Sequence, residues 1–334
     1  MKNMREIDTC IVGATGLVGQ TMLRVLEEYD FPVGKLKLLA SKRSAGSLSV
    51  FKGKEYVVEE LTETSFSGYD LALFSAGASV SQTFGPIARQ AGLVVIDNSS
   101  AWREDPTIPL IVPEVNLEDH TLDPLIANPN CSTIQSVLPL KALQNTFGVT
   151  RVNYTTYQAV SGSGQQGIAD LQATKNGEPA TFYPHDISQT VIPEIDRPME
   201  NGYTKEEQKM INETKKILHQ PDLPVSATCV RVPIENGHGV SIAVELEKEF
   251  SLEQIRACFS QFPGILVVDN LAEHQYPTST LARGTDQVYV GRIRRDLSVE
   301  NGLLFYTVAD NIRKGAAANA VQIALALLQE EVLS

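Results

Sequence analysis

The sequence lacks several features that mark particular classes of protein. No run approaches the roughly 20 apolar residues of a membrane-spanning helix. The most apolar stretch, residues 316–328, is interrupted by Asn319 and Gln322. The first residues contain no separate apolar region followed by a small-residue cleavage site. These absences predict a cytoplasmic protein that is not embedded in a membrane.

Cysteine is also scarce. The chain has four cysteines, and they lie far apart without a CxxC pair: Cys10, Cys131, Cys229 and Cys258. This distribution suits neither a disulfide framework nor a zinc site, so we expect no bound metal. At most one of the four needs a special explanation.

Positive charge is in deficit. Lys and Arg number 28 against 40 Asp and Glu, which gives a formal net charge of −12. The electrostatic field of a protein with this net negative charge repels a phosphate backbone, so nucleic acid is not an expected partner. An anionic small ligand must instead be captured by a local cluster of basic groups and backbone amides.

The length and composition indicate an ordinary globular protein of about two domains, at roughly 150 residues per domain. The 334 residues are 43% hydrophobic and 20% charged. No repeat, low-complexity tract or Gly/Ser linker divides them, so the domain boundaries must come from changes of pattern.

The first 130 residues alternate short β-rich runs with helical stretches. This alternation predicts a Rossmann-type, doubly wound α/β domain with a parallel sheet. The expected strands are 9–12, 36–40, 71–75, 93–97 and 125–127, and the expected helices are 17–28 and 79–91.

From about residue 149 the pattern changes to longer alternating strands with few helices between them. The expected strands are 151–160, 226–233, 240–247, 288–294 and 303–308. They predict a mixed or antiparallel sheet in a second domain of α+β type. A final helix over 314–333 is long enough to return to the first domain. We therefore expect one domain of residues 1–130 with 313–334, and a second of residues 131–312.

A glycine-rich loop follows the first expected strand. The segment GATGLVG contains Gly13, Gly16 and Gly19, and Leu17 opens an amphipathic helix. The spacing G-x-x-G-x-x-G permits a tight turn with backbone amides aimed at a pyrophosphate. The spacing alone also suits a purely structural turn, but its place at the first strand-to-helix junction favours a dinucleotide.

The segment after the second expected strand, LLASKRSAG, bears on which dinucleotide is bound. It has no carboxylate to hold a ribose 2′-hydroxyl, whereas Ser41, Arg43 and Ser44 could hold a 2′-phosphate. This composition favours NADP over NAD. The alternative, in which Lys42 and Arg43 are solvated surface charges, stays open.

One cysteine has the setting of a nucleophile. Cys131 follows an Asn-Pro-Asn turn where a helical pattern begins. Unpaired amides and the positive end of a helix favour the thiolate there. The alternative is a packed core cysteine, a role that fits Cys10, Cys229 and Cys258 better.

A nucleophilic cysteine needs an acid/base partner, and His238, between Gly237 and Gly239, is the best candidate. A lone histidine in a glycine turn is also compatible with a surface position. Further anion-binding candidates are Arg103, Lys216 and Arg231. Each of them alone would suit a surface charge, and only a shared pocket would make them a site.

Together these segments resemble the aspartate-β-semialdehyde dehydrogenases, and the resemblance covers essentially the full length. The matching segments are VGATGLVG, ASKRSAG, IDNSSAWR, IANPNCSTIQ, YQAVSGSGQQG, NETKKIL, VRVPIENGHG and DNIRKGAA. The resemblance implies a catalytic and dimerisation domain like that of glyceraldehyde-3-phosphate dehydrogenase. It also implies NADPH-dependent reduction of L-4-aspartyl phosphate to the semialdehyde through a cysteine thioester, in the biosynthesis of lysine, diaminopimelate, threonine, methionine and isoleucine.

The resemblance also implies residue roles. Cys131 would be the acyl-thioester nucleophile, His238 the proton donor and acceptor, and Gln158 the group that orients the reacting carbonyl. Arg231 would hold the substrate α-carboxylate and Glu213 its amino group.

Phosphate and cofactor positions follow in the same way. Arg103, Lys216 and Asn98 resemble the phosphate site. The cofactor positions are Gly13, Ala14, Thr15, Gly16, Leu17 and Val18 for the pyrophosphate, Ser41, Arg43 and Ser44 for the 2′-phosphate, and Ser161, Gly162 and Asn311 for the nicotinamide. Members of the family are homodimers or tetramers, which implies the same here.

Two other hypotheses stay open. A related acyl-phosphate or acyl-CoA reductase, such as an N-acetyl-glutamyl-phosphate reductase, shares the domain plan and a Cys/His pair. A non-catalytic NADP-binding paralogue is an alternative of another class, although Cys131, Gln158 and His238 argue against it. A short-chain reductase is disfavoured because none of the ten tyrosines is followed four residues later by lysine.

Overall fold

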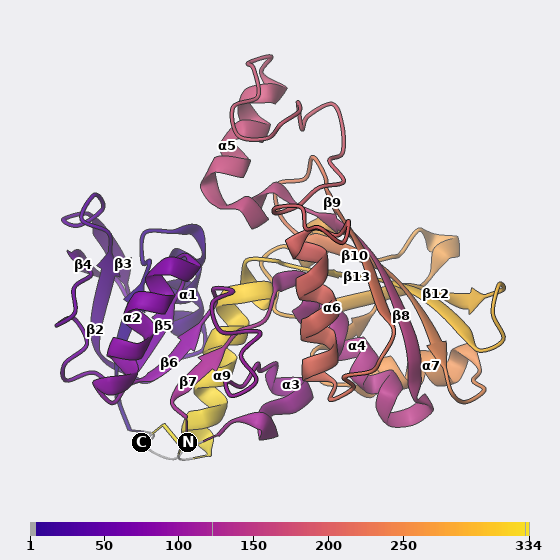
Figure 1. Cartoon of the computed structure of the whole chain (residues 1–334), viewed down its shortest axis with the longest axis horizontal. Coiled ribbons are helices and arrows are strands. Elements are labelled where there is room, and N and C mark those ends of the chain that lie inside the picture. Colours follow the sequence, from indigo (N-terminus) through magenta and orange to yellow (C-terminus); the bar gives the residue numbers. More distant parts are fainter. Residues whose placement is uncertain (1–4, 122, 331, 334) are drawn as a thin grey trace. The chain divides into compact units, whose positions relative to one another are not determined.

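The computed structural model describes residues 5–121, 123–330 and 332–333, which form two compact units (Figure 1). One unit consists of Met1–Pro129 with Ala316–Ser334, and the other of Asn130–Gly315. The first division lies one residue before the predicted boundary, and the return to the first unit comes three residues after the predicted one.

A seven-stranded sheet forms the centre of the first unit, in the order β3-β4-β2-β1-β5-β6-β7. Its strands are β1 (Ile7–Val12), β2 (Val33–Ala40), β3 (Leu48–Phe51), β4 (Lys54–Glu60), β5 (Leu71–Phe74), β6 (Val94–Asp97) and β7 (Leu125–Ala127). All neighbours are parallel except the antiparallel β3–β4 pair. The predicted doubly wound fold is therefore confirmed. The β3–β4 hairpin was not predicted, because exposed side chains such as Leu48, Val50 and Val57 give it no clear buried face.

The helices of this unit are α1 (Leu17–Glu28), α2 (Ala78–Gln90), α3 (Pro113–Asn116) and α9 (Ala318–Gln329). Side chains of α1 and α9, including Met22, Leu26, Val321 and Leu327, belong to one buried core. One continuous final helix over 314–333 is the wrong expectation. Residues Arg313–Ala317 form a π-helical turn in which the Gly315 amide donates to the Asp310 carbonyl, and residues 331 and 334 lie outside the described chain.

A six-stranded mixed sheet forms the second unit, in the order β11-β12-β13-β10-β8-β9. The strands are β8 (Val149–Gln158), β9 (Val225–Arg231), β10 (His238–Leu246), β11 (Ile265–Val267), β12 (Val288–Asp296) and β13 (Gly302–Ala309). β8 with β9 and β11 with β12 are parallel, and the other neighbours are antiparallel. The mixed sheet predicted for the second domain is confirmed.

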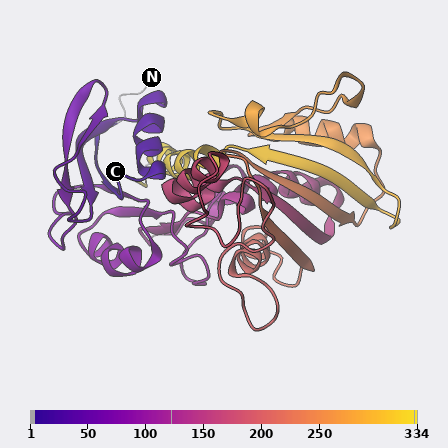
Figure 2. The same cartoon turned by 90° about the horizontal axis from the view of Figure 1, so that it is seen from above.

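Its helices are α4 (Cys131–Phe147), α5 (Gly164–Lys175), α6 (Lys205–Ile217), α7 (Leu252–Gln261) and α8 (Ser279–Ala282). The expectation of few helices is wrong: five occur in the described part of this unit, and α6 carries the buried carboxylates Glu206 and Glu213 among apolar residues on its inner face. Helix α4 packs on β8, β10, β12 and β13, while α6 packs on β9 and α7 on β11 and β12 (Figures 1 and 2). Among the described residues, no helix is both long enough and apolar enough to cross a membrane.

Candidate active site

The glycine-rich loop joins β1 to α1 at the carboxyl end of β1. Gly13 has φ of +83°, and a Cβ atom there would lie 2.9 Å from the Ser75 backbone. A Cβ atom at Gly19 would lie 2.3 Å from the Gly13 carbonyl oxygen. Both positions therefore require glycine, and together they let the helix approach the strand closely enough to form a cradle for a pyrophosphate.

Some backbone amides of this loop are bonded within the protein, and others are left for a ligand. Those of Gly13 and Ala14 donate to the Leu39 carbonyl, and that of Gly16 donates to Gly13. Gly16 caps α1 without a side-chain hydrogen bond, so the first-turn amides of Leu17 and Val18 face the loop. Thr15 is exposed. The predicted pyrophosphate loop thus holds its shape through residues 13–16 and offers donors mainly from its helical end.

The segment after β2 forms an exposed turn. The Ser44 amide donates to the Ser41 carbonyl at 2.8 Å, while Ser41 and Arg43 are exposed and Ser44 is half-buried. Because β1 and β2 are parallel neighbours, this turn leaves the sheet at the same edge as the glycine-rich loop. The position and chemistry of the turn fit the 2′-phosphate of an adenosine ribose.

Asn98 and Arg103 lie together after β6 in the first unit. The Arg103 guanidinium donates to the Asn98 carbonyl oxygen at 2.6 Å, and the Asn98 side-chain oxygen accepts from Asn128. The side-chain nitrogen of Asn98, Nδ2, is buried and has no hydrogen-bond partner among the described residues. A cation beside such a donor is suited to an anion. Lys216, the third predicted phosphate ligand, is half-buried near the end of α6 in the other unit.

Three strands of the second unit bring predicted site residues to one edge of its sheet. Gln158 and Arg231 end β8 and β9 and are register partners. His238 begins β10, which runs antiparallel to β8 with Gly239 opposite Tyr157, so His238 lies beside Gln158. None of these three side chains is more than 5% exposed. Strand register thus assembles residues that are up to 80 positions apart.

Cys131 is the first residue of α4, as the sequence predicts. The side-chain oxygen of Asn130 accepts from the amides of Ser132 and Thr133 and so caps the helix. Cys131 is half-buried, and a Cβ atom at Gly315 would lie 2.8 Å from its own Cβ. A side chain at position 315 would therefore crowd Cys131.

His238 is fully buried. Its Nδ1 accepts the Ala159 amide hydrogen at 3.0 Å, so the neutral ring carries its proton on Nε2. Burial and the charge of Arg231 hold the pKa of His238 well below its usual value. Nε2 is buried without a hydrogen-bond partner in the described chain. A neutral Nε2–H donor is thus available to a ligand near neutral pH.

Arg231 lies beside this histidine. Its Nη1 donates to the Ala159 carbonyl oxygen at 2.7 Å, and its Nε is buried without a partner among the described residues. A Cβ atom at Gly162 would approach Arg231 Nη1 to 2.8 Å and His238 Nε2 to 3.1 Å. Gly162 therefore leaves open the space into which both side chains point.

Ser161 and Asn311, predicted on the nicotinamide side, are buried and contact each other. The Asn311 amide nitrogen donates to the Ser161 hydroxyl at 3.0 Å, and its oxygen accepts the Gly237 amide hydrogen at 2.8 Å. Asn311 thereby connects η2 (Val160–Ser163) to the turn before His238.

Helix α6 supplies the remaining contacts. Glu213 is buried, and one of its oxygens accepts the Asn130 amide hydrogen at 2.7 Å. Glu206 accepts from the side chains of Asn130 at 2.9 Å and Gln158 at 3.2 Å. One helix thus holds the residue before the nucleophile and the predicted orienting glutamine.

The sequence interpretation assigned no role to Asn130, Ala159, Glu206 or Gly315. An Asn before Cys-Ser-Thr is an N-cap signature, and Thr204 with Glu207 forms a capping box that predicts the start of α6. Glu206 lies seven residues before Glu213, which puts both on one helix face. The Ala159 and Gly315 contacts depend on tertiary packing and have no local signal.

Of the other three cysteines, Cys10 and Cys229 are buried in the core and Cys258 is half-buried. Burial raises the pKa of Cys10 to about 12, and it also raises those of Cys229 and Cys258. All four cysteines are in the described chain, and none forms a disulfide. No group of three or more His, Cys, Asp or Glu side chains that could hold a metal ion occurs among the described residues.

Comparison with known proteins identifies the family. The NAD binding domain of the semialdehyde dehydrogenases matches residues 8–122, and their dimerisation domain matches residues 140–314. The aspartate-semialdehyde dehydrogenase of Aquifex aeolicus is 52% identical, over 97% of this chain and 98% of the relative. That of Bacillus subtilis is 47% identical, also over 97% and 98%.

Solved structures agree with the sequence relatives. Aspartate semialdehyde dehydrogenase II of Vibrio cholerae, complexed with ASA, superimposes with a TM-score of 0.93 at 45% identity, over 97% of this chain and 99% of that one. The Candida albicans enzyme with NADP has a TM-score of 0.78 at 26% identity, over 97% and 98%. The chain therefore belongs to the semialdehyde dehydrogenase family, and within it to the aspartate-semialdehyde dehydrogenases, which are oxidoreductases of amino-acid biosynthesis.

Proposed function

We propose that the protein reduces L-4-aspartyl phosphate to L-aspartate-4-semialdehyde and phosphate with NADPH, through a thioester on Cys131, in the biosynthesis of lysine, diaminopimelate, threonine, methionine and isoleucine. The assembly of Gln158, Arg231 and His238 at one sheet edge carries this proposal. In it, most of the cofactor contacts come from the first unit, and the side chains that convert the substrate come from the second.

Cys131 Sγ bonds to the acyl carbon while the carbon–oxygen bond to phosphate breaks, and the phosphate leaves with the electron pair. The start of α4 favours the thiolate needed for this attack, and the Asn130 cap keeps the first turn in place. Gln158 orients the reacting carbonyl. The family resemblance assigns Asn98, Arg103 and Lys216 to the phosphate, where a cation stabilises the charge that grows on the leaving group.

Two charged side chains select the amino-acid part of the substrate. The Arg231 Nε has no other described partner, so Nε and an Nη nitrogen can bind the α-carboxylate as a fork. Glu213 binds the α-amino group. An N-acetylated substrate has no ammonium group for Glu213, and this difference separates the proposed substrate from N-acetyl-glutamyl phosphate.

His238 acts on the carbonyl oxygen. When the thioester is reduced, its Nε2–H donates to the oxygen on which negative charge develops. As the carbon–sulfur bond breaks, the aldehyde carbonyl forms again and Cys131 regains the thiolate. The depressed pKa keeps His238 neutral and its Nε2 proton in place at neutral pH.

NADPH, when bound, supplies the hydride for the thioester carbon. The residues that would hold it are those of the glycine-rich loop, which a Cβ atom at Gly13 or Gly19 would obstruct. Ser41, Arg43 and Ser44 would bind the 2′-phosphate. Ser161, Gly162 and Asn311 would contact the nicotinamide.

Phosphate-dependent NADP reduction tests the proposal. We expect purified protein given L-aspartate-β-semialdehyde and NADP to produce NADPH only when inorganic phosphate is present, and Cys131→Ser to abolish the signal. Activity with the N-acetyl-glutamyl semialdehyde and none with the aspartyl compound would contradict the assignment. Silence with both would leave the non-catalytic alternative.

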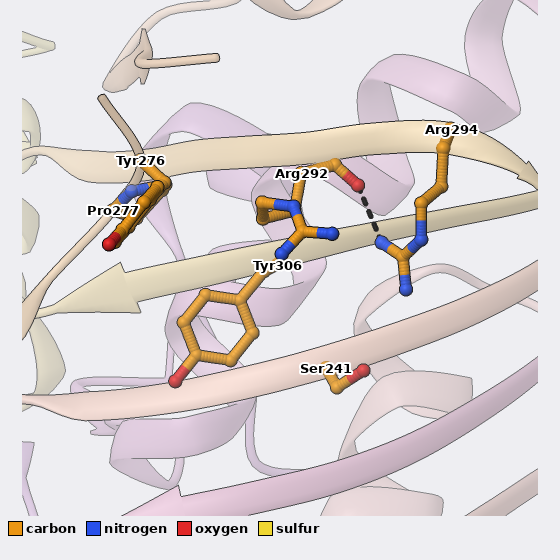
Figure 3. A pocket seen from close by; sticks show the side chains of 6 residues that line it. All are labelled: Ser241, Tyr276, Pro277, Arg292, Arg294 and Tyr306. Atoms are coloured by element: carbon orange, nitrogen blue, oxygen red, sulfur yellow. Dashed lines mark hydrogen bonds between the residues drawn. The ribbon is translucent and has the colours of Figure 1, made fainter. Parts of the chain in front are cut away.

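The sheet of the second unit supports a further part of the proposal, a homodimer. Its helices α4, α6 and α7 pack on one face, whereas Ser241 and Tyr306 lie on the other, where a hollow of about 300 Å³ is also lined by Tyr276, Pro277, Arg292 and Arg294 (Figure 3). This sheet falls within the segment that matches the dimerisation domain. We propose that a second copy of the chain covers this face, as a dimer or within a tetramer.

Light scattering of the purified protein tests the assembly. We expect a mass of at least twice the 36.5 kDa of one chain. Ala243, two residues after Ser241, is half-buried on the same face, so Ala243→Arg should shift the mass to that of one chain. An unchanged mass in this variant would contradict the proposed interface.

A further inference from the structure

Two carboxylates of α6 fix the residue that precedes the nucleophile. Glu213 accepts the backbone amide hydrogen of Asn130, and Glu206 Oε1 accepts from its side-chain nitrogen at 2.9 Å. Meanwhile the Asn130 side-chain oxygen caps α4 through Ser132 and Thr133. The amide group of Asn130 is therefore held on both sides, by Glu206 at its nitrogen and by the first turn of α4 at its oxygen.

The same Glu206 oxygen accepts a second hydrogen bond, from Gln158 Nε2 at 3.2 Å. Its other oxygen accepts from Lys209 Nζ at 3.2 Å, and Lys209 also contacts Asp196 at 2.7 Å. Burial alone would raise the pKa of Glu206, but the charge of Lys209 and the hydrogen bonds from Asn130 and Gln158 lower it instead. Glu206 is therefore an ionised acceptor at neutral pH.

We propose that Glu206 is a positioning residue of the active site, which holds Gln158 and the first turn of α4 in one fixed arrangement. The inference rests on the proposed function for the roles of Gln158 and Cys131. An ionised carboxylate can accept but not donate, so it selects the amide orientation of Gln158 in which Nε2 faces Glu206. Gln158 Nε2 is then bound to Glu206 and also to Thr156 Oγ1 at 3.3 Å, and these two contacts fix the plane of the side-chain amide.

Glu207 provides a matched control in the same helical turn. It is also buried, and its two oxygens accept from the Thr204 amide at 2.7 Å and the Cys229 amide at 3.0 Å. Neither contact involves Asn130 or Gln158. Glu207→Gln therefore removes a buried charge from the same place without disturbing the two groups that Glu206 holds, and glutamine keeps the capping box.

The first measurement is independent of any substrate. In ¹⁵N-labelled protein, the side-chain amide protons of Gln158, assigned by their loss in Gln158→Ala, should exchange slowly with water because they are buried and bound to a carboxylate. Glu206→Gln should speed this exchange at least about tenfold, because the neutral amide is a weaker acceptor and its nitrogen would face the Lys209 ammonium in place of the oxygen that now accepts from it. Glu207→Gln should leave it unchanged. Equal exchange in the wild type and Glu206→Gln would overturn the proposed hold on Gln158.

The second measurement is steady-state kinetics with L-aspartate-β-semialdehyde. Glu206→Gln should lower kcat about 10- to 100-fold with KM changed less than about threefold, because misplaced groups slow the chemical step more than they weaken binding. Glu207→Gln should keep kcat within about twofold. A loss of kcat that is equal in both variants, or a loss of thermal stability alone in Glu206→Gln, would contradict a positioning role.

A double-mutant cycle identifies the route of the effect. In Gln158→Ala protein, adding Glu206→Gln should lower kcat by clearly less than it does in the wild type, because only the contact with Asn130 is left for the substitution to disturb. Fully additive losses would overturn the action through Gln158. If the wild type itself does not reduce NADP with this substrate, the proposed function fails, while the exchange measurement still decides whether Glu206 holds Gln158.

Discussion

In the first unit the residues proposed to bind the cofactor offer backbone amides and exposed side chains, whereas the residues proposed to bind the substrate in the second unit are buried side chains held by other buried groups. The glycine-rich loop and the Ser41–Arg43 turn leave the ends of adjacent parallel strands with few side-chain contacts. Gln158, Arg231 and His238 instead lie in the interior, and Glu206 or Ala159 contacts each of them.

Because of this difference, substitutions in the two units should change different kinetic constants. An exposed side chain that binds a ligand contributes to affinity and little to the structure around it, so its loss should appear in KM. A buried side chain that contacts reacting atoms contributes to the rate, so its loss should appear in kcat.

The largest expected effect is on the second unit. His238→Ala should lower kcat about 10³-fold, because the Nε2–H donor is lost, while the Kd for NADP stays within about twofold. Steady-state kinetics and a fluorescence titration of the cofactor measure the two quantities. His185→Ala, which removes an exposed histidine of the same unit, serves as the control. A kcat within threefold of the wild type would remove His238 from the proposed chemistry.

We expect the reactivity of the four thiols to separate Cys131 from the other three cysteines. Cys131 starts a helix and is half-buried, whereas burial raises the pKa of Cys10, Cys229 and Cys258. Iodoacetamide at pH 8 should therefore modify Cys131 at least about 100-fold faster than the others. Peptide mapping by mass spectrometry after one equivalent measures this ratio. Label found mainly on another cysteine would contradict the electrostatic argument for Cys131.

The first unit should show an effect on affinity alone. Arg43→Ala should raise the KM for NADP about tenfold or more, because a charge-assisted hydrogen bond to the 2′-phosphate is lost, while kcat and the KM for NAD stay unchanged. Lys42→Ala is the matched control, since Lys42 is the adjacent exposed cation. An equal rise for both cofactors, or for both variants, would show that Arg43 does not select NADP.

The two regions also differ in how far the sequence predicts them. The glycine spacing and the position of Cys131 at a helix start are local, so they could be recognised from neighbouring residues. The contacts of His238 with Ala159 and of Gln158 with Glu206 join residues 79 and 48 positions apart. Only the strand register and the packing of α6 create them. The resemblance to a known family supplied the roles of Gln158 and Glu213. It did not point to Glu206, the buried carboxylate that contacts Gln158.

The same limit explains the errors in the fold. Strand periodicity predicted both sheets because alternating or continuous apolar residues report burial directly. Helix α6 was not predicted although its buried face is periodic: the segment is polar overall, and Glu206, Glu207 and Glu213 lie among its buried residues. The π-helical turn at Arg313–Ala317 escaped because its geometry depends on the Asp310 carbonyl and on the closeness of Gly315 to Cys131. In both places a local rule is broken beside the active site.

The smallest expected effect is on stability and concerns pH. The pKa of His238 is lowered in the folded protein, so below about pH 6.5 the unfolded chain binds a proton there that the folded chain does not. Stability must therefore fall as the pH falls below 6.5, by up to about 1.4 kcal/mol per pH unit from this group.

Urea unfolding of the wild type and His238→Asn at pH 7.0 and pH 5.5 isolates this contribution. Asparagine can still accept the Ala159 amide hydrogen, but it does not titrate. The wild type should lose about 1 kcal/mol more than the variant between the two pH values, since the rest of the chain titrates alike in both. Equal losses would mean that His238 is accessible to protons in the folded protein. His238 would then not belong to the buried site of the second unit, and the contrast with the exposed loops of the first unit would fail at this residue.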